Sequence, residues 1–108
     1  MADPLDALRP DLFADHVVFV TGGGSGINLG VARAYARLGA AVGICGRNAD
    51  RLAAAKAALE SAGARAVATV VADVRDPEAV DAAMEQARSA LGPMNTLVCG
   101  AAGNFPAP

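Results

Sequence analysis

The sequence predicts an α/β fold built around a parallel sheet, and three observations lead to this prediction. Short apolar runs alternate with segments in which apolar residues recur at helical spacing. Glycine or proline separates most of these segments from one another. A glycine-rich turn follows the first apolar run and opens the first helical segment. Such alternation is typical of a parallel sheet that carries helices on both faces.

Seven elements are expected, each for a local reason. The apolar runs typical of strands lie at 16–20, 41–45, 66–72 and 96–99. The helical spacing of apolar residues covers 26–38, 49–62 and 77–91. Gly39 and Gly63 end the first two helices. Asp76 caps the third helix and Pro77 is its first residue, since proline has no N–H to leave unpaired.

The apolar stripe of each helix is expected to pack on the sheet. The stripes are Ile27, Val31, Ala34 and Leu38, then Leu52, Ala55 and Leu59, and finally Val80, Met84, Ala87 and Leu91. The run at 66–72 is apolar throughout, so we expect a strand buried on both faces.

Composition narrows the classes of function. The net charge of -2 and a pI near 5.1 argue against a nucleic-acid-binding surface. No apolar stretch approaches the roughly 20 residues that cross a bilayer, and the N-terminal residues 1–4 are acidic with no apolar signal region. Two cysteines and one histidine are too few for a typical metal site. Because Cys45 and Cys99 lie in apolar runs, we expect buried free thiols and a cytoplasmic protein.

The turn at residues 21–27, Thr-Gly-Gly-Gly-Ser-Gly-Ile, predicts a diphosphate site. Glycines permit a tight turn and the close approach of an anion, while the first N–H groups of the helix point toward it. The site would comprise Gly22, Gly24, Ser25, Gly26 and Ile27. The spacing fits neither G-x-G-x-x-G nor a P-loop. A plain glycine-rich turn between strand and helix is the alternative.

Four segments are expected to meet at one edge of the sheet. The glycine turn, Gly46-Arg47, Asp73-Val74 and residues 100–105 each follow a strand. The carboxyl ends of parallel strands lie together, and ligands bind there in open α/β sheets. This arrangement predicts a Rossmann-type doubly wound fold, with residues 1–15 as an extension and 16–108 as a dinucleotide-binding domain.

The residues Thr21-Gly22-x-x-x-Gly26-Ile27 resemble the cofactor motif of the short-chain dehydrogenase/reductase family. The resemblance runs from about residue 10 to the end of the chain. It implies that Asp73 and Val74 contact the adenine of a nicotinamide cofactor. It also implies that the turn after the fourth strand packs beside the nicotinamide riboside; this turn comprises Gly100, Ala101, Ala102 and Gly103.

The segments 101–105 and 73–77 are similar to one branch of that family, the 2,4-dienoyl-CoA reductases and their bacterial relatives. This similarity implies a small-molecule substrate of the acyl-CoA class, such as an enoyl- or dienoyl-CoA thioester. Asn104 would donate a hydrogen bond to it and Phe105 would line the pocket. Ordinary packing of Phe105 under the loop is the alternative.

The chain departs from the family pattern at two places. Asn28 stands where the family usually has glycine. Asparagine tolerates a positive φ and its amide can reach a phosphate, so we expect the diphosphate site to be kept. Cys99-Gly100 replaces asparagines that help to connect neighbouring strands in the family. Cys99 has no histidine partner in the sequence and is not expected to be a nucleophile.

The end of the second strand predicts the form of the cofactor. An NAD site would place a carboxylate there to accept hydrogen bonds from the ribose hydroxyls. Gly46 leaves space for a 2′-phosphate, and the Arg47 guanidinium can pair with it. NADP(H) is therefore the expected cofactor. Alternatively, Arg47 is a solvated residue before the next helix cap.

The family's catalytic groups are a serine, and a tyrosine four residues before a lysine. Here the one tyrosine, Tyr35, is followed at that distance by Gly39, and the one lysine, Lys56, lies within a helix. We therefore expect no catalytic residue in this chain and interpret it as the N-terminal cofactor half of a longer oxidoreductase. The resemblance implies a homotetramer. The alternatives are a self-standing nucleotide-binding module and a carbonyl or 3-oxoacyl reductase.

Overall fold

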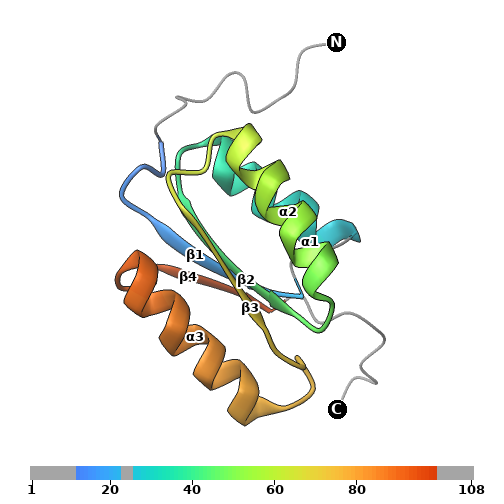
Figure 1. The fold of residues 1–108 in the computed structure, drawn as a ribbon. Coiled ribbons are helices and arrows are strands. Elements are labelled where there is room, and N and C mark those ends of the chain that lie inside the picture. The colour runs from blue at the N-terminus through green and yellow to red at the C-terminus, as the bar shows by residue number, and fades with distance from the viewer. Residues whose placement is uncertain (1–11, 23–25, 100–108) are drawn as a thin grey trace.

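The computed structural model describes residues 12–22 and 26–99. Its elements are β1 (Val17–Thr21), α1 (Gly26–Arg37), β2 (Ala41–Gly46), α2 (Ala49–Ala62), β3 (Val67–Val71), α3 (Pro77–Leu91) and β4 (Thr96–Cys99). The four strands form one parallel sheet in the order β3-β2-β1-β4 (Figure 1). The predicted α/β Rossmann-type fold is confirmed, and every element boundary falls within one residue of its expected position.

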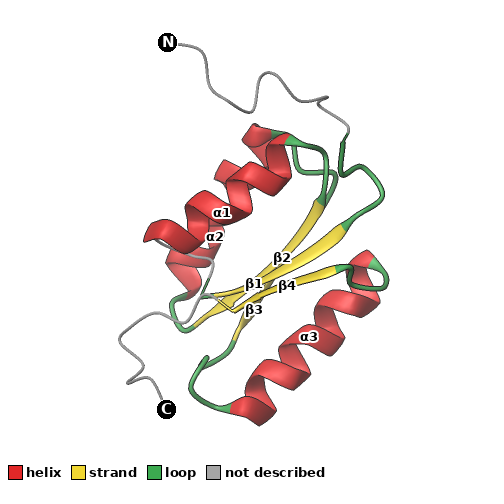
Figure 2. Cartoon of the chain, turned by 180° about the vertical axis from the view of Figure 1, so that it is seen from behind, coloured by secondary structure: helices red, strands yellow, loops and turns green. Residues whose placement is uncertain are grey.

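Helices cover both faces of the sheet, as a doubly wound fold requires (Figure 2). Helices α1 and α2 lie on one face, where α1 contacts β1 and β2 while α2 contacts β2 and β3. Helix α3 lies on the other face, against β3, β2 and β1. The sheet is therefore a central layer between two helical layers. Its parallel strands all end at the same edge of the sheet.

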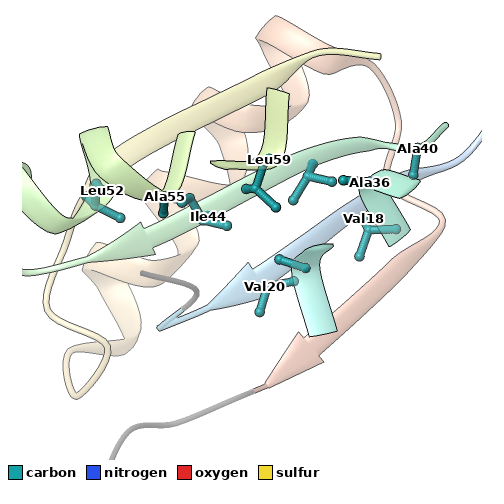
Figure 3. Close-up of a cluster of buried hydrophobic side chains, with 10 residues drawn as sticks. Val18, Val20, Ala36, Ala40, Ile44, Leu52, Ala55 and Leu59 are labelled. Carbon is teal, nitrogen blue, oxygen red and sulfur yellow. The ribbon is translucent and has the colours of Figure 1, made fainter. Parts of the chain in front are cut away.

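The two central strands form most of the core, because successive side chains alternate between the two faces. Val18 and Val20 of β1 point toward α1 and α2, together with Ile44 of β2 (Figure 3). Phe19 and Cys45 point toward α3. Every residue of β1 and the first five of β2 are buried. A strand covered on both faces has an apolar run in place of an alternating pattern, as β1 does.

The predicted stripe of α2 is confirmed, but those of α1 and α3 are partly wrong. Leu52, Ala55 and Leu59 are buried, as expected. In α1 the buried residues are Ala32 and Ala36, whereas the side chains of Val31 and Ala34 are only partly covered and Ile27 is 86% exposed. In α3 the buried residues are Ala83 and Ala87, while Val80, Met84 and Leu91 are half-buried.

Both errors have the same cause. A helix that lies close to a sheet does so through its smallest side chains, so the alanine stripe faces the strands and larger residues flank it. Apolar periodicity ranks isoleucine and leucine above alanine and therefore rotates the predicted face. Only the helix whose largest apolar residues also face the sheet, α2, agrees with the prediction.

Strand β3 is not buried on both faces, which corrects a second expectation. Thr69 is exposed and Val71 is 61% exposed, while the remaining residues are half-buried. The reason is its position, since β3 is the outermost strand on one side of the described sheet. An apolar run alone does not distinguish a central strand from an edge strand.

Gly43, in the middle of β2, sets the distance between the sheet and α3. A Cβ at this position would lie 2.9 Å from Phe19 Cδ2 and 3.1 Å from Ala87 Cβ. The phenylalanine ring and the helix therefore occupy the space that any side chain would need. Glycine is required here by close packing in the core.

Candidate cofactor site

The carboxyl ends of the strands meet at one edge of the sheet, as predicted. The register places Thr21 opposite both Cys45 and Cys99, and Gly46 opposite Val71. The pairing continues into the loops, since the N–H of Gly22 donates to the Cys45 carbonyl at 2.9 Å. Strand β1 has its sequence neighbour β2 on one side and β4 on the other, so strand order reverses between β1 and β4. Open α/β sheets bind ligands at such a point.

The glycine turn begins and resumes with left-handed backbone. Gly22 has a φ of 67° and Gly26, the first residue of α1, has a φ of 63°. Around Gly26, apart from its two chain neighbours and the backbone of its own helix, no heavy atom lies within 4 Å of the place that a Cβ would take. Open space beside the first N–H groups of a helix suits an anion such as a diphosphate. Gly24 and Ser25 lie outside the described residues.

Asn28 has a different role from the one expected. Among the described residues only glycines have a positive φ, so the explanation from left-handed backbone is wrong for Asn28. Its side chain Nδ2 instead donates to the Gly22 carbonyl at 3.2 Å. The amide thus connects the first turn of α1 to the end of β1. Ile27 lies beside it with 86% of its surface exposed, at the open edge of the sheet and away from the core.

Arg47 lies directly after β2 with an exposed side chain. In the ranges 12–22 and 26–99 it has no ion-pair partner. The next residue, Asn48, caps α2, and its Oδ1 accepts a hydrogen bond from the Arg51 N–H at 3.0 Å. Because β2 ends at Gly46 and the helix cap is Asn48, Arg47 is the single residue between strand and cap, and it lies at the edge of the sheet. Its guanidinium is accessible to an anion there.

Asp73 follows β3 and is held by Arg75. Asp73 Oδ1 accepts from the Arg75 backbone N–H at 2.9 Å and from Nε at 3.1 Å, and Oδ2 accepts from Nη2 at 3.0 Å. The hydrogen bonds from the Arg75 side chain are the main cause that lowers the pKa of Asp73 to about 2. The positive charge of Arg47 lowers it further. Asp73 is therefore a carboxylate throughout the physiological range. The adjacent Val74 is half-buried against the core on the α3 side.

Two residues of this edge have a role that sequence reasoning missed. The sequence reasoning did not single out Arg75: aspartate commonly forms a turn to the backbone N–H two residues on, but no local signal predicts the contact of the two side chains. Thr21 is buried, and its Oγ1 donates to the Val98 carbonyl at 3.4 Å. This hydroxyl connects β1 to β4 near the place where the family's asparagines would act.

Some of the remaining predicted residues lie within the described ranges, and the others lie outside them. Tyr35 packs against Phe13, with ring centroids 5.4 Å apart, which agrees with its expected packing role, and Lys56 is exposed on α2. Cys45 is a buried free thiol, as expected, and burial raises its pKa. The other predicted positions lie outside the described residues: Gly100, Ala101, Ala102, Gly103, Asn104 and Phe105.

The described ranges, 12–22 and 26–99, lack two further features. They contain no cluster of three or more histidine, cysteine or acidic side chains that could hold a metal ion. In the same ranges no helix has both the length and the apolar character that a bilayer span demands.

Comparison with known proteins identifies the family to which this chain belongs. A sequence profile of the short chain dehydrogenase family matches residues 16–108. A peroxisomal 2,4-dienoyl-CoA reductase of Danio rerio is 38% identical over 99 residues, which cover 92% of this chain and 33% of the relative. A 3-dehydrosphinganine reductase of Arabidopsis thaliana is 42% identical over 81 residues, or 75% of this chain and 23% of the relative.

Solved structures agree. A short-chain type dehydrogenase/reductase from Mycobacterium ulcerans superposes with a TM-score of 0.78 at 37% identity, over 86% of this chain and 34% of that one. L-sorbose reductase from Gluconobacter frateurii, complexed with NADPH and L-sorbose, gives 0.77 at 37% identity, over 89% and 36%. This chain spans about a third of the length of the dienoyl-CoA reductases that it matches. The fold, the profile and these relatives together show that the chain belongs to the short-chain dehydrogenase/reductase family and is similar to its 2,4-dienoyl-CoA reductases.

Proposed function

We propose that this chain is the cofactor-binding part of an NADP(H)-dependent oxidoreductase. The observation that carries the proposal is the end of β2, where Gly46 and the exposed Arg47 stand in place of a carboxylate. A carboxylate at this position would repel a 2′-phosphate, whereas a guanidinium pairs with it and can stack on an adenine. The Cβ of a residue at Gly46 would make only an ordinary contact of 3.6 Å with Leu52 Cδ2, so packing does not explain this glycine.

The backbone donors and charges of the described residues suit such a cofactor. The turn between Gly22 and Gly26 would hold the diphosphate, with N–H groups of α1 as donors. Arg47 would hold the 2′-phosphate, and Asp73 with Val74 would border the adenine. The bound cofactor supplies the hydride that the reaction transfers. The protein residues at this edge bind and orient the cofactor, and they exchange no proton with a substrate.

Relatives support the choice of cofactor. The L-sorbose reductase structure contains NADPH. The C-domain of a bacterial malonyl-CoA reductase, solved with NADP, superposes on this chain with a TM-score of 0.75 at 30% identity, over 85% of this chain and 15% of that one. These proteins have the same fold as this chain and bind the phosphorylated cofactor, which favours NADP(H) over NAD(H).

The test is a fluorescence titration of NADPH and NADH with the full-length protein and its Arg47→Ala variant. A hydrogen bond to a charged group contributes about 1.5–3 kcal/mol, so the variant should lose about ten- to a hundredfold in NADPH affinity. NADH affinity should change little. Arg65→Ala is the matched control, since Arg65 is also an exposed arginine but lies at the opposite end of the strands. Equal losses for both cofactors would contradict the proposal.

For the substrate we propose an acyl-CoA thioester, either enoyl- or dienoyl-CoA. The 2,4-dienoyl-CoA reductases among the relatives support this class. A ketone substrate is the second candidate, favoured by the 3-dehydrosphinganine reductases among the relatives. A panel of dienoyl-CoA, 3-oxoacyl-CoA and simple ketones, followed by NADPH oxidation, separates the two. Activity confined to sugars or steroids would contradict the thioester proposal.

We also propose a cytoplasmic homotetramer that binds neither nucleic acid nor membrane. The acidic composition supports the absence of nucleic-acid and membrane binding, because a chain with a net charge of -2 does not attract nucleic acid or an anionic membrane surface. Light scattering on the full-length protein tests the tetramer. A self-standing nucleotide-binding module would bind NADPH and show no hydride transfer on any substrate of the panel.

A further inference from the structure

Two arginines and one aspartate follow neighbouring strands at the edge of the sheet. Arg47 leaves β2 and Asp73 leaves β3, and these strands are neighbours in parallel register. Gly46 pairs with Val71, and the N–H of Ala72 donates to the Gly46 carbonyl at 2.9 Å. Because paired strands lie about 4.8 Å apart, Arg47 and Asp73 leave the sheet within about one residue of each other on neighbouring strands. The effect of Arg47 on the pKa of Asp73 is consistent with this proximity.

Arg75 occupies most of the hydrogen-bonding capacity of Asp73. A carboxylate has about four acceptor positions, and Arg75 fills three of them with its backbone N–H, Nε and Nη2. The turn that presents these donors is closed by a further hydrogen bond, from the Asp76 N–H to the Asp73 carbonyl at 3.0 Å. The Asp73 carboxylate is thus committed to the arginine two residues along its own chain.

Without Arg75, the carboxylate would turn to the other nearby cation. Arg47 has an exposed fork of donors that can bind one carboxylate or one phosphate. An Asp73–Arg47 pair would occupy that fork and place a negative charge where a 2′-phosphate should lie. We propose that Arg75 is a specificity-determining residue for the phosphorylated cofactor: it holds Asp73 and so leaves Arg47 available to the 2′-phosphate. This inference rests on the proposed function.

The experiment is a double-mutant cycle on the full-length protein, with NADPH and NADH titrated by cofactor fluorescence. The four proteins are the wild type, Arg75→Ala, Asp73→Asn and the double variant. Arg75→Ala should weaken NADPH binding about two- to fivefold, the range of an exposed ion pair, and leave NADH binding unchanged. In the Asp73→Asn background the same substitution should have no effect, because the competing charge is gone.

A matched control comes from α3. Arg88 holds Glu85 with the same fork, at 2.7 Å and 3.3 Å, and both side chains are exposed. Arg88→Ala removes an equivalent pair away from the strand ends and should alter the affinity of neither cofactor. Raising the salt concentration should reduce the effect of Arg75→Ala, since exposed charges are screened.

The outcomes separate this inference from the proposed function. An Arg75→Ala variant that loses affinity equally for both cofactors, or keeps its loss in the Asp73→Asn background, overturns the inference. The first result would mean a general role in the turn, and the second a direct contact with the phosphate. A wild-type protein without preference for NADPH overturns the proposed cofactor as well. A preference that depends on Arg47 but not on Arg75 overturns the inference alone.

Discussion

The end of β1 and the ends of β2 and β3 lie on the same edge of the sheet but are built differently. At β1 the available groups are backbone ones, with Gly22 and Gly26 in left-handed conformation and Asn28 bonded to a backbone carbonyl. At β2 and β3 the groups are charged side chains, Arg47, Asp73 and Arg75. Backbone donors suit the diphosphate that every nicotinamide cofactor has. The charged side chains can distinguish one cofactor from another.

The largest effect is expected from Gly22→Val, which should abolish binding of NADPH and NADH alike. A β-branched residue is strongly disfavoured at the φ of 67° that Gly22 adopts. Gly22→Asn is the control, since asparagine tolerates this region and should retain part of the affinity. Titration with both cofactors, together with circular dichroism to verify folding, measures the effect. Selective loss of one cofactor would show that the two parts of the edge are not independent.

The second prediction concerns pH and acts only on the charged part. The pKa of Asp73 lies near 2, below its ordinary value of 3.8, so its ion pair is complete above about pH 4 and is lost as the pH falls toward 2. The charge of Asp73 therefore does not change between about pH 8 and pH 5. A phosphate monoester gains a proton near pH 6, so NADP affinity should fall several-fold across this range.

Calorimetry with the oxidised cofactors checks this prediction. NAD affinity should be flat over the same range, because its phosphates have no second proton to gain. Arg47→Ala should remove most of the slope for NADP. A slope of equal size for both cofactors would point to a titrating group of the protein at the diphosphate turn.

The third prediction concerns Asn28. Asn28→Gly restores the residue usual in the family and removes the hydrogen bond from Nδ2 to the Gly22 carbonyl. Such a bond contributes about 0.5–1.5 kcal/mol, so both cofactors should lose the same factor of about two to ten. Complete loss of binding would identify the Asn28 amide as an essential contact to the cofactor. Loss confined to NADPH would contradict its assignment to the backbone part of the edge.

The smallest effect is expected from Gly30→Ala in α1. No heavy atom lies within 4 Å of the position of its Cβ, and its φ is not left-handed. Replacing a helical glycine by alanine should raise the free energy of unfolding by about 0.4–1 kcal/mol and leave both affinities unchanged. Denaturant titration measures the first and fluorescence the second. A change in affinity would mean that the diphosphate turn extends further into α1 than Gly26.

The fold could be predicted from sequence because its signals are local. Asp76 and Pro77 mark the start of α3, and the Asp76 carboxylate does accept from the Glu78 N–H, at 3.0 Å. The positions of Gly22, Arg47 and Asp73 at one edge also followed, since strand order in chain and parallel pairing fix them. What failed depends on neighbours in space. Nothing local shows that Ala32 packs on the sheet in preference to Ile27.

The charged part of the site was only half predicted for the same reason. Arg47 was identified through its chemistry. Whether its guanidinium is available to a phosphate depends on whether the neighbouring Asp73 carboxylate pairs with it or with another cation. That is decided by Arg75, through contacts with Asp73 that the sequence does not show. Likewise Asn28 was expected to face the cofactor, and in the fold its amide meets a backbone carbonyl.

Gly43 allows the sheet and α3 to pack closely, and this close packing has a consequence for the edge of the sheet. It lets α3 lie directly on Phe19 at the middle of the sheet, and α3 begins at Pro77, four residues after Asp73. The first turn of this helix directly follows the loop that presents Asp73 and Arg75. A methyl group added at Gly43 would meet Phe19 and Ala87, so the ring or α3 would have to move. Such a movement of α3 would reach the loop that presents Asp73 and Arg75, because that loop leads directly into the helix.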